Sequence, residues 1–134
     1  MKATGSFDVT TNPLEATAAG SDGVRLNRMS IDKIFSGDLS GTSKGEMLTA
    51  MTPVKGSAGY VAIEQVKGVL KGKTGSFVLQ HFGTMSAGEE RLILEVVPDS
   101  GQSGLKGLSG EMEIIIKNGE HFYEFDYSFE SQEQ

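Results

Sequence analysis

The closing segment of the chain, residues 121–130, constrains the fold more than any other feature. One side of an extended backbone here carries His121, Tyr123, Phe125, Tyr127 and Phe129. The opposite side carries acidic or polar groups, with Phe122 as the exception. Alternation with period two predicts a β-strand that has one buried and one solvated face. The segment therefore predicts an all-β protein closed around an aromatic interior.

Length and composition narrow the class of protein. The 134 residues suit one domain, residues 1–134. Cysteine is absent, which excludes disulfides and thiolate metal sites. The N-terminus lacks the apolar run of a secretory signal, and no segment approaches the roughly 18 apolar residues of a membrane span. We therefore expect a cytoplasmic protein.

The charge balance argues against polyanionic partners. Twelve Lys and Arg residues face 18 Asp and Glu residues, for a formal net charge of −6. This charge repels phosphate backbones and anionic lipid, so we expect neither nucleic acid nor a membrane as partner. Arg25, Arg28 and Lys33 form one basic segment, which we interpret as a solvated strand face rather than a docking patch.

Glycines and turn residues divide the chain into extended segments. Glycine accounts for 18 of the 134 residues, where a share of roughly 7 per cent is usual. Asn118-Gly119 predicts a two-residue hairpin turn, and no segment has convincing helical periodicity. Eight strands are expected near residues 2–10, 24–36, 38–51, 57–70, 74–83, 90–98, 108–117 and 121–130. Long, sequential, evenly spaced strands favour an eight-stranded antiparallel closed barrel over a two-sheet sandwich.

A weak internal repeat places a leucine between glycines three times. Leu39, Leu70 and Leu105 are each followed by a glycine and then by a strand that opens with a small or acidic residue. We interpret the repeat as a recurring bend at which glycine permits curvature and leucine closes the end of the core. Chance in a glycine-rich chain is the alternative.

Two histidines and one carboxylate are the candidate functional groups. His81 follows Phe77 and Leu79 on one strand face, so it is either a hydrogen-bonded core residue or a polar group aimed into a cavity. Its other strand face is apolar too, so we expect a loop or a second subunit to cover it. His121 suits a mouth position beside a turn.

Glu64 faces the same way as Tyr60, Ala62 and Val66, so it lies at the barrel rim or is buried with a partner. Burial alone would raise its pKa unless a cation lies close. Arg91 is one cation to consider, and Glu46 is a weaker case of the same kind. Carboxylates and histidines do not cluster at metal-ligand spacing, so no metal and no cofactor are expected.

Several segments together resemble a bacterial family of unknown function whose fold is related to the allene oxide cyclase barrel. The resemblance rests on GSFVLQHFGT (75–84), VVPDSGQSGLKGLSG (96–110), GYVAIEQVKGVLKGKTGSF (59–77), FDYSFE (125–130) and ATGSFDV near the N-terminus. It implies an eight-stranded barrel with an internal cavity and frequent self-association, but no reaction. Glu64, Gln80 and His81 fall in its strongest motifs. The loop at residues 98–105 departs from the family pattern, and an aromatic residue near the first loop is missing.

Three hypotheses for function follow, and fold analogy does not choose among them. The first is a barrel that binds a small, largely apolar molecule, lined by Phe, Tyr and Met. Its ligand-binding candidates are Tyr60, Glu64, His81, His121 and Tyr123. The second is a self-associating barrel with a filled core, in which the chain forms a homo-oligomer. The third is a cyclase or isomerase that uses Glu64 or His81, although no catalytic residue is assigned.

Overall fold

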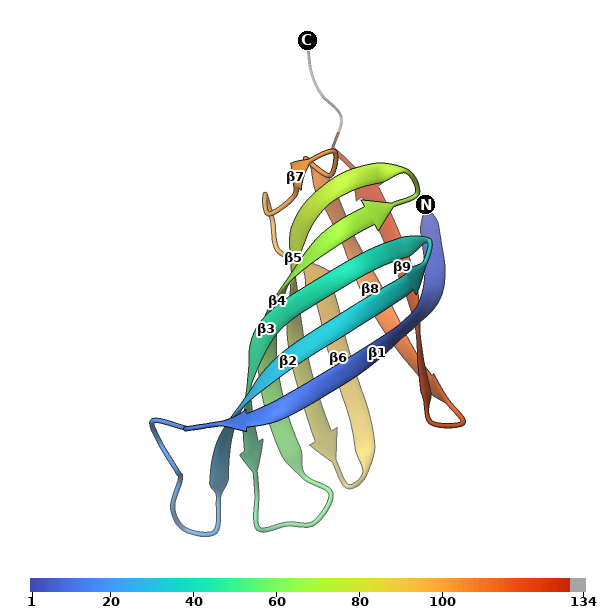
Figure 1. Ribbon diagram of the computed structural model, residues 1–134. Coiled ribbons are helices and arrows are strands. Elements are labelled where there is room, and N and C mark those ends of the chain that lie inside the picture. The colour runs from blue at the N-terminus through green and yellow to red at the C-terminus, as the bar shows by residue number, and fades with distance from the viewer. Residues whose placement is uncertain (131–134) are drawn as a thin grey trace.

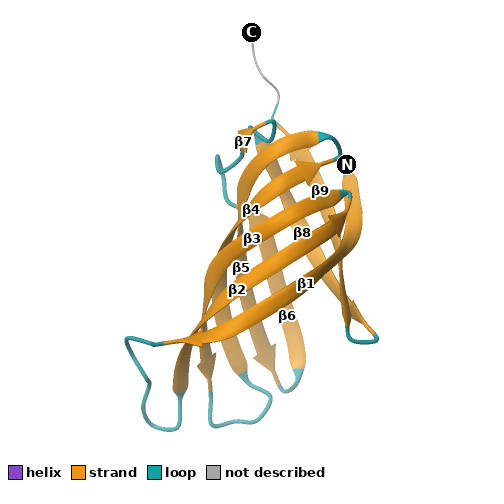
Figure 2. Cartoon of the chain, viewed as in Figure 1, coloured by secondary structure: helices purple, strands orange, loops and turns teal. Residues whose placement is uncertain are grey.

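The computed structural model describes residues 1–130, and all its regular structure is β-strand (Figures 1 and 2). Nine strands follow one another along the chain. They are β1 (Lys2–Leu14), β2 (Arg25–Gly37), β3 (Leu39–Met51), β4 (Ala58–Leu70), β5 (Lys73–Ser86), β6 (Glu89–Val96), β7 (Gln102–Ser103), β8 (Leu108–Lys117) and β9 (Glu120–Phe129). Residues 1–130 contain no helix that could cross a membrane.

The eight long strands close into an antiparallel barrel. Pairing runs β4-β3-β2-β1-β9-β8-β6-β5, and β4 also pairs with β5, which completes the circle. Consecutive long strands are neighbours, while β9 returns to lie beside β1, with Ala3 opposite Phe125. β7 is a two-residue strand that adds to the start of β5. The expected eight-stranded closed barrel is confirmed, and the sandwich alternative is wrong.

Local sequence explains how the strands form and turn. β4 alternates between buried residues such as Ala62 and Val66 and exposed ones such as Val61 and Ile63. A half-buried strand requires this period of two. The hairpin predicted between β8 and β9 is present, because Asn118 and Gly119 adopt φ values of 51° and 79°. Two positive φ values belong to the type I′ turn, whose twist matches that of the flanking strands.

One end of the barrel is packed solid with aromatic and leucine side chains. Tyr123, Phe125 and Tyr127 are buried there, as the alternation of β9 predicts. The three repeat leucines are buried at the same end, and Leu39 lies directly opposite Leu70. The interpretation of these leucines as a plug is confirmed. The aromatic residues therefore fill the closed end of the barrel.

The barrel wall is weakest between β6 and β8. These strands share a single bridged pair, Glu95 with Glu111, whereas β8 and β9 pair along their whole length. The β8–β9 hairpin swings away from β6 toward its turn (Figure 1). Leu92 and Ile116 keep 37% and 63% of their surface exposed as a result. The interior is thus open to solvent on this side.

The largest boundary difference from the sequence prediction is at the end of β1, and one short strand was not predicted. β1 extends to Leu14 rather than ending near residue 10, because it pairs with β2 as far as Arg28. Pairing with a neighbouring strand extends a segment whose own sequence signals a loop. The loop after Val96 contains β7, which the sequence did not predict. A two-residue strand is too short to produce a periodic pattern.

Candidate functional site: a buried polar cluster below an open cavity

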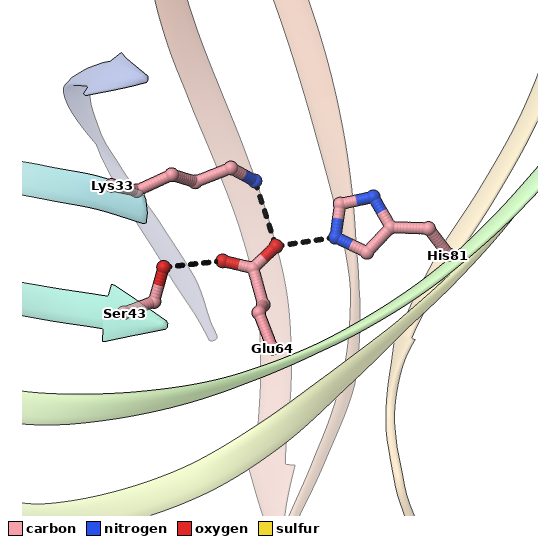
Figure 3. A network of polar contacts seen from close by, with 4 residues as sticks. All are labelled: Lys33, Ser43, Glu64 and His81. Carbon is pink, nitrogen blue, oxygen red and sulfur yellow. Dashed lines mark hydrogen bonds and ion pairs between the residues drawn. The ribbon is translucent and has the colours of Figure 1, made fainter. Parts of the chain in front are cut away.

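Four polar side chains from four consecutive strands meet inside the barrel (Figure 3). Lys33 lies on β2, Ser43 on β3, Glu64 on β4 and His81 on β5. Lys33 Nζ donates to Glu64 Oε2 at 2.8 Å, and Ser43 Oγ donates to Glu64 Oε1 at 2.7 Å. His81 Nε2 makes a short hydrogen bond to Glu64 Oε2. Glu64 is 0% exposed, and Lys33 and His81 are 3% exposed, so the cluster is almost completely buried.

The partners of Glu64 keep it ionised despite its burial. Burial is the largest single influence and raises the pKa of Glu64. The hydrogen bond from His81, the charges of Lys33 and His81 and the hydrogen bond from Lys33 together outweigh it and lower the pKa to about 2. Burial without a nearby cation would have the opposite result. Glu64 is therefore a carboxylate that accepts hydrogen bonds and donates none.

The ionised carboxylate fixes the orientation of His81. Because Glu64 can only accept, Nε2 of His81 must carry a hydrogen and donate it. The other ring nitrogen, Nδ1, forms no hydrogen bond among residues 1–130, and it is not enclosed, because no fully buried side-chain nitrogen or oxygen in those residues lacks a partner. Figure 3 shows this nitrogen turned away from Glu64. His81 is thus both a hydrogen-bonded core residue and a polar group that faces a cavity.

A cavity of about 470 Å³ lies between the cluster and the open end of the barrel. Its apolar lining comes mainly from aliphatic side chains: Val9, Ile31, Met47, Leu92, Ile114 and Ile116. Phe7 and Tyr60 are its aromatic side chains, and Lys33, His81, Glu90 and His121 are its polar ones. The expected Phe, Tyr and Met are present as Phe7, Tyr60 and Met47, but Val, Ile and Leu side chains outnumber them.

Tyr60 occupies a special place in the cavity wall. It borders the cavity and also a second pocket of about 450 Å³ at the same end of the barrel. Its ring lies over Gly83 on the facing strand, where a Cβ atom would collide with the ring. Burial, followed by the charge of Glu90, raises the pKa of Tyr60. The absence of a Cβ atom at Gly83 thus leaves room for the ring of Tyr60 in the cavity wall.

His121 lies at the mouth of the cavity, where the sequence predicted it. It follows the Asn118-Gly119 turn, lines the cavity and packs its ring 5.2 Å from the ring of Phe7. Glu90 stands at the same rim on β6 and is exposed. The rim therefore carries one histidine and one solvated carboxylate above an apolar lining.

Tyr123, the fifth candidate, lies away from the cavity and supports the closed end. The backbone N–H of Leu39 donates to its hydroxyl at 2.8 Å. The hydroxyl in turn lies 3.0 Å from the carbonyl oxygens of Ser36 and Leu39, either of which can accept its proton. Burial raises the pKa of Tyr123, while the hydrogen bond from Leu39 lowers it. The residue fastens β9 to the turn between β2 and β3.

Lys33 and Ser43 are the members of the site that sequence reasoning missed. The interpretation of Lys33 as part of a solvated basic face is wrong, since Lys33 is buried between Ile31 and Phe35 on the inner face of β2. That alternation is visible in the sequence, but Ile34 on the outer face makes both faces look apolar. The cation beside Glu64 is thus Lys33, and Arg91 instead lies over the ring of Phe82.

Glu46 is the weaker carboxylate candidate and does not belong to the site. It lies on the exposed side of β3, where its Oε1 is 2.5 Å from Nε of Arg28. Within residues 1–130, no three His, Asp or Glu side chains group closely enough to hold a metal ion. The site therefore consists of one buried ion pair, two further hydrogen-bonding groups and an apolar cavity.

The outer surface of the barrel carries an apolar row of its own. Leu48, Val61, Phe82 and Ile93 occupy directly paired positions on β3, β4, β5 and β6. All four are exposed, and Phe82 is 45% exposed. The loop after β6 reaches the first half of β5, where the backbone N–H of Val97 donates to the carbonyl of Val78 and the N–H of Val78 donates to Ser100 Oγ. The expectation that the outer face of β5 is covered thus holds for Val78 but not for Phe82 in the single chain.

Fold and site together define a closed eight-stranded antiparallel barrel with a buried polar cluster below an open cavity. The chain belongs to DUF3224, a family of proteins of unknown function, whose family model matches residues 3–127. A member of this family from Shewanella oneidensis MR-1, of unknown function and with a crystal structure at 1.84 Å resolution, is 61% identical. The alignment covers 98% of each chain with a TM-score of 0.96. No curated protein matches the chain. The resemblance to a bacterial family of unknown function, read from the sequence, is confirmed.

Proposed function

We propose that this barrel binds a small, largely apolar molecule in the cavity above the polar cluster. The observation that carries the proposal is a cavity of about 470 Å³ with an aliphatic lining and few polar groups. Ligand sites have this composition, since apolar walls supply affinity and a few polar groups fix orientation. The opening between β6 and β8 supplies an entry route. The proposed site takes in Tyr60, His81 and His121 of the predicted residues, with Glu64 behind them.

A matched pair of tryptophan variants tests this proposal. Ile114 lines the cavity, while its neighbour Ile115 faces outward on the same strand. Ile114→Trp should fill the cavity and abolish binding of an apolar fluorescent dye, whereas Ile115→Trp should leave binding intact. Native mass spectrometry of protein purified from its own host would show whether a ligand is retained. Equal dye binding by both variants would contradict the proposal.

Self-association is a second candidate, favoured by the exposed apolar row. Four apolar side chains in register on adjacent strands form a contiguous patch, which in soluble proteins often marks an interaction surface. We propose that a second copy of the chain covers this row. The proposal is independent of the cavity, because the row lies on the opposite side of the same strands.

Light scattering coupled to size-exclusion chromatography tests the second candidate. Phe82→Glu should shift an oligomer toward monomer, because it places a charge in the centre of the patch. Val69→Glu is the control, since Val69 is exposed on β4 outside the row. A monomer at high micromolar concentration in the unaltered protein would remove this candidate.

Catalysis of the cyclase or isomerase type is a third hypothesis, in which the barrel confines a flexible apolar substrate beside Glu64 or His81. Within it, the structure favours His81 over Glu64 as the group that a substrate would meet. Glu64 is fully buried behind Lys33, Ser43 and His81, whereas His81 borders the cavity. Turnover that survives Glu64→Gln unchanged would argue against any proton-transfer role for this pair.

A further inference from the structure

Two polar groups at the inner end of the cavity retain hydrogen-bonding capacity. Nδ1 of His81 forms no hydrogen bond among residues 1–130, and His81 borders the cavity although it is only 3% exposed. The Lys33 ammonium has three donor hydrogens, and its one hydrogen-bond partner in the same residues is Glu64. Both groups border the cavity and contact the same oxygen of Glu64. They are therefore close neighbours.

At about pH 7 the charge balance of the cluster favours an unprotonated Nδ1 on His81, whereas the charge of His81 acts on Glu64 at the acidic pH where that carboxyl group titrates. The positive charge of Lys33 already compensates the negative charge of Glu64, and Lys33 Nζ also lies 4.8 Å from the centre of the Phe7 ring. A second cation beside Lys33 would have no counter-ion of its own in a site of low dielectric constant. Nδ1 of His81 is thus an acceptor that faces the cavity next to an ammonium donor.

We propose that the ligand is an apolar carboxylic acid whose carboxyl group binds between Lys33 Nζ and His81 Nδ1. This inference rests on the proposed function and adds the ligand's chemical class. One carboxyl oxygen accepts from Lys33. The other shares a proton with Nδ1 of His81, while the apolar body lies against the aliphatic wall. Hydrogen bonds to ionised groups are roughly twice as strong as neutral ones, which favours an acid over an alcohol of equal length.

Proton balance follows directly from this arrangement. At about pH 7 a free aliphatic acid is ionised. The bound state needs one proton between the carboxyl oxygen and Nδ1, and that proton comes from solvent. Whichever atom holds the proton, the site gains a neutral acid overall, and Lys33 and Glu64 keep their charges. Binding therefore takes up one proton, and no other bond is made or broken.

The other charged groups around the cavity are compatible with this placement. Glu90 and His121 belong to the rim, and Glu90 is exposed, so water screens its repulsion of an acid bound at the inner end. Ser43 Oγ donates to the far oxygen of Glu64 and so adds no competing charge. The inner end thus offers the ligand one cation and one proton acceptor.

Isothermal titration calorimetry with octanoic acid and octan-1-ol tests the proposal. The two probes share chain length and differ in the head group. The acid should bind about tenfold tighter or more, as a charge-assisted hydrogen bond predicts. Lys33→Met should reduce this ratio toward one. Leu92→Ala is the control, because loss of an apolar contact in the same cavity should weaken both probes alike and leave the ratio unchanged.

A second measurement uses only the unaltered protein, in case Lys33→Met does not fold. Titrations in two buffers with different ionisation enthalpies measure the protons taken up on binding. Octanoic acid should take up about one proton, and octan-1-ol none.

An alcohol that binds as tightly as the acid, or an acid that binds without proton uptake, would overturn the carboxyl assignment while leaving the proposed function standing. Failure of both probes and of apolar dyes to bind would overturn the two together.

Discussion

A single substitution that breaks the ion pair between Lys33 and Glu64 should lower the free energy of unfolding strongly. Glu64→Gln keeps the size of the side chain and removes its charge. The Lys33 ammonium then stays buried between the rings of Phe7 and Phe35 without a counter-ion. Breaking a buried pair in this way costs about 3–5 kcal/mol, because the remaining charge is uncompensated. We expect a loss of this size in the free energy of unfolding near neutral pH.

The dependence on pH gives this prediction a second signature. The folded-state pKa of Glu64 is lowered to about 2 from an ordinary value of 4.5. A carboxyl group with a depressed pKa contributes stability that is present above its unfolded pKa and lost as pH falls through its folded pKa. The shift corresponds to about 3 kcal/mol. The stability difference between the original protein and Glu64→Gln should therefore be largest above about pH 5 and shrink steadily toward pH 2.

Urea denaturation followed by circular dichroism measures both quantities. Glu46→Gln is the matched control, because Glu46 pairs with Arg28 on the solvent side of the neighbouring strand and should change stability little. The double variant Lys33→Met with Glu64→Gln should recover part of the loss, because it removes the uncompensated charge. A neutral-pH difference below about 1 kcal/mol, or one that does not change with pH, would refute this reasoning.

Three further substitutions address other parts of the structure. Tyr123→Phe should destabilise the barrel by about 1–2 kcal/mol in urea denaturation, because hydrogen bonds at the closed end are lost. Dye binding should be unchanged, and a large loss of binding would contradict the placement of Tyr123 outside the cavity. Gly83→Ala should displace the ring of Tyr60 and lower the free energy of unfolding by about 1–3 kcal/mol. It should also weaken dye binding in a fluorescence titration, and unchanged binding would show that Tyr60 is not part of the site. His121→Ala should weaken binding of the same dye only modestly, because His121 lies at the rim, and abolished binding would move the centre of the site toward the mouth.

Alternation along single strands made most of the fold predictable. β9 and β4 each have a clear buried face, so the direction of the core, the burial of Tyr123 and the inward placement of Glu64 all follow from period two. The leucine repeat also predicted the closed end, because a large side chain between glycines at a bend can pack in one direction only. These features depend on residues close together in sequence.

Features that depend on two distant strands were not predictable in the same way. Lys33 reaches Glu64 because β2 lies only two strands from β4 in the barrel. The local sequence of β2 does not reveal this, because both faces of that strand contain apolar residues. Ser43 is a small polar residue among glycines on β3, with nothing in its local pattern to distinguish it. The filled aromatic end and the aliphatic cavity also depend on where along the barrel axis each strand places its large residues. Register between strands determines that, and a single sequence does not give register directly.

Methyl-resolved NMR during a titration with octanoic acid tests the central claim most directly. If the ligand enters the cavity above the polar cluster, the methyl signals of Met47 and Ile114 should shift and saturate together. Those of Leu39 and Leu70 at the closed end should stay in place. Shifts confined to Leu48 and Ile93 on the outer face, or no shifts at saturating probe, would contradict an internal binding site.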